Sequence, residues 1–250
     1  MIKVDSIHKS FADNHVLKGI SAEFEQGKTN LIIGQSGSGK TVFLKCMLGL
    51  HELDAGSIFF DGRDFNRMDF KERKEVRKEL GMVFQGGALF DSMTVEENVM
   101  FPLNMFTNQT RGEKLMRVNE VLDRVNLNGK NHLFPSETSG GMQKRIAIAR
   151  AISMNPKYLF CDEPNSGLDP RTAIVIDTLI AEITHEYQMT TVINTHDMNS
   201  VMEIGEKIVF LKDGHKAWEG TSDSILKTDH EAVVDFVYTS KILRSIREKN

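Results

Sequence analysis

The sequence predicts an α/β fold: a mainly parallel sheet, an antiparallel β subdomain at the N-terminus and an inserted helical subdomain. Short apolar strands alternate with helical segments from about residue 31 onward, which is typical of a parallel sheet with crossover helices. Residues 1 to about 30 alternate apolar and polar side chains, as half-buried strands do. Residues from about 95 to 153 carry helical patterns and few strand signals, which predicts the insertion.

The N-terminal half of the sequence carries the patterns of three short strands and two helices. The apolar run Asn30–Ile33 predicts a strand that ends at Gly34, and a helix follows from about residue 39 to 48. A strand and a turn are expected over 56–62, and a short strand over 81–83 that runs into a loop. Between them, residues 65–80 are dense in charges that alternate in sign at helical spacing. This pattern favours a solvated helix over a membrane or DNA contact.

The C-terminal half continues the alternation. The apolar run Tyr158–Asp162 predicts a strand covered on both faces. A helix over about 171–187, a strand over 191–195, a helix over about 198–205 and a strand over 208–211 are expected after it. From about Ser222 we expect helices. One of them carries Val233, Val234, Phe236 and Val237 and should pack on the rest of the chain, and a basic end follows with Lys241, Arg244, Arg247 and Lys249.

Composition excludes several classes of protein. The chain has 250 residues, 40% of them hydrophobic and 26% charged, as in ordinary globular proteins. Its 35 acidic against 31 basic residues leave a net charge of −4, which disfavours a nucleic-acid partner. No run approaches the ~18 apolar residues of a membrane-spanning helix, and the first residues lack the pattern of a signal peptide. The two cysteines, Cys46 and Cys161, fit core positions in a reducing compartment, so the cytoplasm is expected.

Residues 34–41 match the phosphate-binding pattern GxxxxGK[ST] at every position. Glycines allow backbone N–H groups to turn toward an anion, and the N-terminal end of the following helix attracts the same charge. Lys40 can reach the β and γ phosphates, and the Thr41 hydroxyl can bind Mg²⁺. The nucleotide-binding residues expected here are Gly34, Gln35, Ser36, Gly37, Ser38, Gly39, Lys40, Thr41 and Val42.

Two adjacent carboxylates end the apolar strand at residue 162. Asp162 is placed to hold a magnesium ion, through a water molecule, and Glu163 points differently because the strand ends there. A carboxylate near the γ phosphate can orient and polarise the attacking water. Asp-Glu pairs are common on protein surfaces, but this pair follows a buried strand and precedes Pro164. The position therefore favours a functional pair.

A capped glycine turn lies upstream of these carboxylates. Ser139 can cap a helix that begins at Gly140, and Gly141 permits another backbone or a phosphate to approach closely. With the phosphate loop and the Asp162-Glu163 pair, the segment Thr138–Arg145 resembles the signature of ATP-binding subunits of ABC transporters. The resemblance covers residues 1 to about 220. Thr138 and Met142 depart from the commonest LSGGQ form, while its Ser-Gly-Gly core is intact.

This resemblance implies a P-loop NTPase of the ABC type that hydrolyses ATP with Mg²⁺ as a homodimer. The signature turn of one copy closes over the ATP that the other copy holds, so Ser139, Gly140 and Gly141 join the nucleotide site. Glu163 is then the catalytic base, His196 contacts the γ phosphate and Gln85 touches the magnesium ion. Phe11 aligns with the aromatic residue that stacks on adenine, and a core role is its alternative. The magnesium-binding residues implied are Thr41, Gln85 and Asp162.

A finer resemblance lies in residues 84–99, with Phe101-Pro102-Leu103 and the SGGM form of the signature. These segments look like those of the ATPase of Mla/Mce-type phospholipid transport systems. That family implies a permease in the inner membrane, a lipid-shuttling MCE-type protein, and a peripheral location on the cytoplasmic face. The apolar residues after Gln85 would form a groove for a permease helix, or pack the helical subdomain. They are Ala88, Leu89, Phe90, Met93 and Val95.

Two alternatives remain within this superfamily. One is a mechanotransmitting ABC ATPase of the cell-division type, and the other is the ATPase of another small-substrate or lipoprotein system. An ABC ATPase that acts on DNA or ribosomes is disfavoured, because such chains need long coiled-coil insertions or two fused ATPase domains. We expect an ABC domain over residues 1–220 and a helical extension over 221–250.

Overall fold

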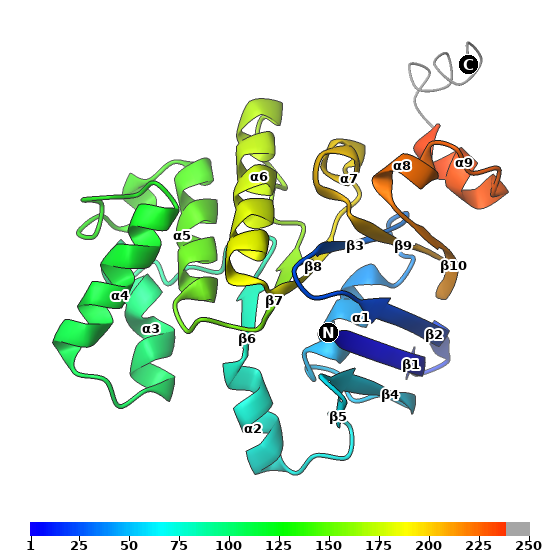
Figure 1. The fold of residues 1–250 in the computed structure, drawn as a ribbon, viewed down its shortest axis with the longest axis horizontal. Coiled ribbons are helices and arrows are strands. Elements are labelled where there is room, and N and C mark those ends of the chain that lie inside the picture. The colour runs from blue at the N-terminus through cyan, green and yellow to red at the C-terminus, as the bar shows by residue number, and fades with distance from the viewer. Residues whose placement is uncertain (239–250) are drawn as a thin grey trace. The chain divides into compact units, whose positions relative to one another are not determined.

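A computed structural model describes residues 1–238 of the chain (Figure 1). It contains two compact units. The first comprises residues 1–25, 29–67 and 194 onward, and the second comprises residues 26–28 and 68–193. The expected basic end, with Lys241, Arg244, Arg247 and Lys249, lies outside the described residues.

The first unit begins with a four-stranded antiparallel sheet in the order β2-β1-β4-β5. Its strands are β1 (Ile2–Phe11), β2 (Asn14–Phe24), β4 (Ala55–Phe60) and β5 (Arg63–Asp64). Ile2 pairs with Phe24 and Val4 with Ala22, so alternate side chains reach the same buried face. The expected antiparallel β subdomain is confirmed.

A second set of strands in this unit follows the order β10-β9-β3. Strand β3 (Thr29–Ile33) runs parallel to β9 (Lys207–Lys212), and β10 (His215–Gly220) is antiparallel to β9. Helix α1 (Lys40–Met47) follows β3, and α7 (Met198–Ile204) precedes β9. All five residues of β3 are buried, as its apolar run predicts. Strand β10 is absent from the sequence prediction.

The C-terminal helices of the first unit are α8 (Ser222–Ile225) and α9 (Glu231–Val237). Val233 and Val237 are buried, and the rings of Phe236 and Phe210 lie 5.2 Å apart between centroids. Helix α9 therefore packs on β9, and the expectation of a packed helix is confirmed.

The second unit contains three strands in the order β8-β7-β6. They are β6 (Leu80–Val83), β7 (Tyr158–Asp162) and β8 (Thr190–Asn194), which ends at the boundary of the unit. Strands β6 and β7 are parallel. Helix α2 (Phe70–Lys78) begins later than the charge pattern suggested, because Asp69 and Glu72 form a capping box that sets its start. Helix α6 (Pro170–Tyr187) connects β7 to β8.

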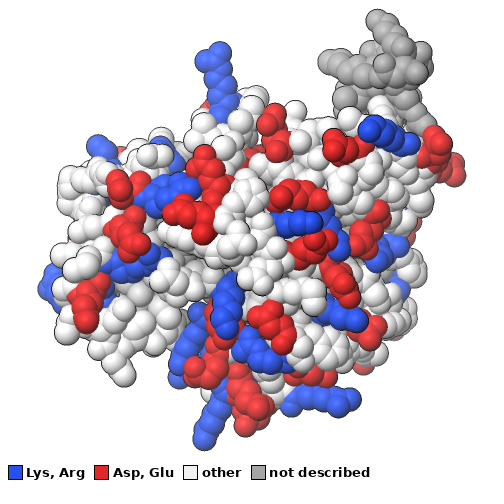
Figure 2. Space-filling model, viewed as in Figure 1, with Lys and Arg blue, Asp and Glu red and all other residues white. Residues whose placement is uncertain are grey.

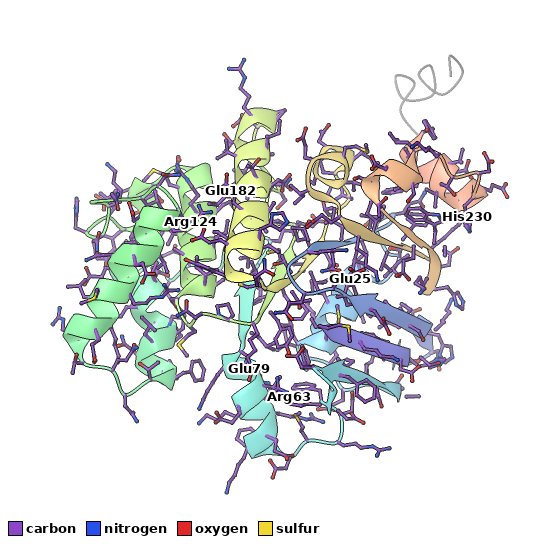
Figure 3. The ribbon with its side chains drawn as sticks, viewed as in Figure 1. Glu25, Arg63, Glu79, Arg124, Glu182 and His230 are labelled. Carbon is purple, nitrogen blue, oxygen red and sulfur yellow. The ribbon has the colours of Figure 1, made fainter. Side chains whose placement is uncertain are left out.

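The expected run of helices fills the rest of the second unit. It comprises α3 (Val95–Phe106), α4 (Arg111–Arg124), the 3₁₀ turn η1 (Pro135–Glu137) and α5 (Gly140–Ile152). Capping boxes of Thr94 with Glu97 and of Thr110 with Glu113 start α3 and α4. Arg124 from α4 and Glu182 from α6 point toward one another (Figure 3), and their side chains form an ion pair at 3.2 Å.

Charged side chains of both signs are mixed on the surface, as expected for a chain with a net charge of −4. Lys and Arg are interspersed with Asp and Glu over the face shown in Figure 2, which has no large basic patch. Within residues 1–238, no helix has both the length and the apolar character that crossing a bilayer requires.

Candidate functional site

The phosphate loop of the first unit joins β3 to α1, and its backbone needs glycine. Gly34 has φ 150°, and a Cβ there would lie 2.3 Å from the Leu211 carbonyl oxygen. Gly37 and Gly39 have φ 83° and 102°, in the left-handed region that side chains disfavour. The main chain therefore turns tightly where the pattern predicts.

Hydrogen-bond donors of this loop are arranged for an anion. No side chain caps the start of α1 at Gly39, which leaves the end of the helix free to bind an anion. The Ser38 hydroxyl is buried and, within the described residues, has no hydrogen-bond partner. Lys40 is 7% exposed, and its Nζ donates to the carbonyls of Gly34 at 2.8 Å and Gln35 at 3.0 Å. A buried hydroxyl beside a lysine and an uncapped helix fits the oxygens of a polyphosphate.

The remaining predicted residues of the first unit lie at its surface. Phe11 is 42% exposed, so the core alternative is wrong. Its ring makes a T-shaped contact with His51, with centroids 5.1 Å apart, and Lys9 Nζ lies 5.3 Å from its centroid. His196 is exposed directly after β8, and Thr41 is exposed in the first turn of α1. Gln35, Ser36 and Gly37 are exposed, while Val42 is half-buried.

In the second unit, Asp162 and Glu163 are half-buried at the end of β7. Glu163 has φ 47°, a left-handed conformation that costs of order 1–3 kcal/mol in a residue with a side chain. Strand β7 ends at Asp162, so Glu163 lies just outside the strand. Gln85, which follows β6, donates from Nε2 to Glu163 Oε2 at 3.0 Å. The structure thus brings together Gln85 and Glu163, two of the three residues, with His196, that the resemblance places around the γ phosphate and its magnesium ion.

The predicted signature turn starts α5 in this unit. Ser139 caps the helix, because its Oγ accepts a hydrogen bond from the Met142 N–H at 3.3 Å. Ser139 and Gly140 are exposed, and Gly141 is half-buried. A Cβ on Gly141 would lie 2.8 Å from the methyl of Thr172, so only glycine fits there without a shift.

An apolar groove of about 420 Å³ lies in the second unit. Aromatic and small residues from the loop after β6 and from α3 form much of its wall, among them Phe84, Ala88, Phe90, Phe101, Pro102 and Phe106. Of the five residues expected to form a groove, Ala88 and Phe90 line it. Val95 is fully buried and serves the core instead, and Leu89 and Met93 are half-buried without lining the groove.

Two cations of α5, whose role is absent from the sequence prediction, bind the loop that carries Gln85. Lys144 Nζ donates to the Gln85 carbonyl, and Arg150 donates to the carbonyls of Gly87 and Ala88 at 2.7 Å each. A charge inside the Ala/Ile-rich run 146–152, such as Arg150, was the available signal, because an ordinary core-facing helix position does not need one.

These features define an ATP-binding subunit, and the comparisons agree. A family model described as "ABC transporter" matches residues 17–166, and the chain belongs to this family. It is an ATPase whose hydrolysis of ATP, with Mg²⁺, is coupled to transport.

The chain is similar to two proteins whose names describe transport functions. The chain is 36% identical over 241 residues to a Mycobacterium leprae protein named "Probable ribonucleotide transport ATP-binding protein mkl", covering 96% of this chain and 70% of that one. It is 35% identical over 259 residues to the methionine import ATP-binding protein MetN of Campylobacter jejuni, covering 97% and 77%.

Solved structures show the same fold. The dimeric ATP-binding cassette MJ0796, bound to ADP and Pi, is 31% identical with a TM-score of 0.80, covering 89% of this chain and 99% of that one. The protein cbiO1 of Clostridium perfringens, part of the ABC transporter complex cbiONQ, is 27% identical with a TM-score of 0.85, covering 98% of both chains.

Proposed function

We propose that this chain drives phospholipid trafficking in a bacterial envelope, as a peripheral subunit on the cytoplasmic face of the inner membrane. The observation that carries the proposal is the segment 84–103, whose sequence resembles that of Mla/Mce-type ATPases and which supplies Phe84, Ala88 and Phe90 to the apolar groove. A short amphipathic helix of a permease is the partner such a groove suits, with apolar anchors inside and polar residues at its rim.

We assign to the site residues the roles that the family resemblance implies. Gly34–Thr41 cradle the phosphates, Lys40 and His196 contact the γ phosphate, and Phe11 stacks on adenine. Thr41, Gln85 and Asp162 supply oxygen ligands of the kind that Mg²⁺ prefers. A bound Mg²⁺ would neutralise charge that develops on the phosphates. Glu163, which accepts a hydrogen bond from Gln85, orients the attacking water and takes its proton.

Two copies of the chain form the working unit. Ser139 to Gly141 of one copy complete the nucleotide site of the other, which the exposure of Ser139 and Gly140 permits. ATP favours the closed dimer because it contacts both copies there, and hydrolysis removes the bridging group so that the dimer opens. The permease follows this motion through the groove, and an MCE-type protein receives or delivers the lipid beyond the membrane.

Substitution of the proposed base tests the chemistry. Glu163→Gln keeps the shape and a hydrogen-bonding side chain but cannot accept the proton, so we expect ATP binding and dimerisation to persist. Turnover should fall by about 10²-fold or more, the usual weight of general-base catalysis. Steady-state ATPase near that of the unaltered chain would refute Glu163 as the base.

The cargo is tested separately. The chain is co-purified with its native membrane partner, the bound lipids are identified by mass spectrometry, and lipid exchange is measured in membranes containing the complex. We expect bound phospholipid and ATP-dependent exchange that Glu163→Gln abolishes. A complex that holds no phospholipid and exchanges none would refute the lipid assignment and leave the ATPase assignment intact.

A small-substrate importer is the second candidate. The names of the relatives favour it, since they mention ribonucleotide transport and methionine import. In that case a soluble substrate, and not phospholipid, would stimulate ATP hydrolysis by the complex. A mechanotransmitting complex of the cell-division type would hydrolyse ATP with neither effect.

A further inference from the structure

The loop from Gln85 to Ala88 is fastened to the signature helix α5 by two buried cations. Lys144 and Arg150 are 7% and 8% exposed. Between them they donate to three carbonyls of this four-residue loop, those of Gln85, Gly87 and Ala88. Gly87 and Ala88 both have left-handed φ, of 75° and 48°. Because alanine disfavours that conformation, outside contacts must hold the loop in place.

Gln85 links these contacts to the proposed base. Its carbonyl accepts from Lys144 and, at 3.5 Å, from the Ser166 hydroxyl, while its side chain donates to Glu163 at 3.0 Å. Lys144 and Glu163 also interact through their charges. Burial lowers the pKa of Lys144, and the Glu163 carboxylate opposes that lowering. A continuous line of contacts therefore runs from α5 through Gln85 to Glu163.

The ammonium group of Lys144 is a strong donor, because a hydrogen bond with one charged partner is shorter and stronger than one between neutral groups. It therefore holds the Gln85 carbonyl more firmly than a neutral side chain would, and this bond offsets part of the cost of burying the charge.

We propose that Lys144 is a positioning residue of the ATPase: by fixing the main chain of Gln85, it directs the Gln85 amide onto Glu163. The inference rests on the role of Glu163 in the proposed function. Lys144 contacts neither nucleotide nor water in this scheme, and acts through Gln85 alone. Arg150 fixes the other end of the loop, beside Ala88 and the groove.

The test compares Lys144→Met with Arg117→Met in the purified full-length chain. Arg117 is a matched control, because it also donates to main-chain carbonyls at the other end of α5, those of Ile152 at 2.9 Å and Ser153 at 3.0 Å. We expect Lys144→Met to lower kcat about tenfold or more with KM for ATP nearly unchanged, an effect on the chemical step. Arg117→Met should lose comparable thermal stability and keep its kcat.

Two further variants make the outcome specific. Lys144→Arg keeps a charged donor and should restore most of the rate; Lys144→Gln, a shorter neutral donor, replaces Lys144→Met if that variant does not fold. In a Gln85→Ala background, Lys144→Met should cause no additional loss of kcat, because both changes break the same line of contacts.

The inference is overturned if Lys144→Met behaves as Arg117→Met does, or if its loss of kcat is the same with and without the Gln85 side chain. Glu163→Gln, measured in parallel, separates the two failures. If Glu163→Gln retains turnover, the assignment of the base is wrong. If Glu163→Gln is inactive while Lys144→Met is not impaired, only the positioning role is wrong.

Discussion

At the scale of single residues, the Ser38 hydroxyl should lower the stability of the fold but favour the binding of nucleotide. Its hydroxyl is buried and has no hydrogen-bond partner within the described residues. An unsatisfied buried hydroxyl costs of order 1–3 kcal/mol. This cost would be offset if the hydroxyl binds a phosphate oxygen when nucleotide is present. The unsatisfied hydroxyl therefore indicates a phosphate-binding role for Ser38.

Ser38→Ala should therefore change stability and affinity in opposite directions. Removing the unsatisfied group should leave the free energy of unfolding without nucleotide unchanged or slightly higher. Loss of the phosphate contact should weaken ATP binding by about 0.5–1.5 kcal/mol, or roughly 2- to 13-fold. Thermal melting with and without ATP measures both effects. Weaker folding with unchanged ATP affinity would contradict a phosphate contact at Ser38.

The two cysteines are residues whose burial sets a pH dependence. Burial raises the pKa of the Cys46 thiol to about 12 and raises the pKa of Cys161 as well. In the unfolded chain both thiols ionise near pH 8.5. The folded chain thus binds more protons above that pH, and their contribution to stability, complete below pH 8.5, is lost as the pH rises toward 12.

The raised pKa values of the two thiols predict a measurable loss of stability at alkaline pH. The free energy of unfolding should fall between pH 7.5 and 9.5, and the fall should be smaller in a Cys46→Ala/Cys161→Ala variant. Urea titrations of the two proteins at both pH values measure it, since all other titrating groups are common to both. In the folded chain at pH 8 neither thiol should react with an alkylating reagent. Equal pH slopes would exclude the cysteines as the cause.

Among the residues of the site, the sequence was sufficient wherever the chemistry is local. The glycines at 34, 37 and 39 and the serine at 139 form turns or caps determined by a few neighbouring residues. Contacts over long distances were not predictable. Nothing in the spacing of Gln85 and Lys144 indicates that Lys144 donates to the Gln85 carbonyl. Their approach depends on how α5 packs beside β6.

Among helices and strands, the sequence prediction failed where strand pairing or a helix cap outweighs the local composition. Strand β10 was missed because its residues, His215–Gly220, show little apolar alternation. The turn before it was a usable signal. Asp213 and Gly214 have φ of 51° and 81°, and an Asp-Gly pair is typical of a tight hairpin. The start of α2 depended on the Asp69 cap, which charge periodicity does not reveal.

Helices α4 and α6 are joined by a forked ion pair that makes an element-scale prediction. Arg124 donates to Glu186 at 2.6 Å and to Glu182 at 3.2 Å. Both carboxylates are about half exposed, so solvent screening limits the pair to about 1 kcal/mol. Arg124→Met should lower the melting temperature by about 2–4 °C and increase hydrogen exchange in α4.

A local ion pair serves as the control for that change. Lys78 binds Glu75 within α2, and this exposed pair joins no two elements. Lys78→Met should leave the melting temperature nearly unchanged, since pairs three or four residues apart on a helix contribute only about 0.3–0.5 kcal/mol. A loss in Lys78→Met equal to that in Arg124→Met would show that the link between α4 and α6 has no particular importance.

At the scale of the whole molecule, the proposed role of the signature turn requires two copies of the chain, and this requirement can be tested. If Ser139 completes the nucleotide site of the second copy, Ser139→Arg abolishes turnover but leaves ATP binding to the monomer intact. Lys40→Ala removes the phosphate lysine instead. Each variant alone forms dimers in which both composite sites carry one defect, so each should be inactive.

Mixing the two variants distributes the defects differently. In a mixed dimer, one site receives both Lys40→Ala and Ser139→Arg, while the other receives an intact Lys40 from one copy and an intact Ser139 from its partner. A one-to-one mixture makes about half of the dimers mixed, so up to about a quarter of the sites should be functional. If the serine served its own chain's nucleotide, no combination would be functional. ATPase assays on mixtures whose pairing is verified by native mass spectrometry therefore distinguish the two arrangements, and absence of recovered activity in verified mixed dimers would exclude the shared site.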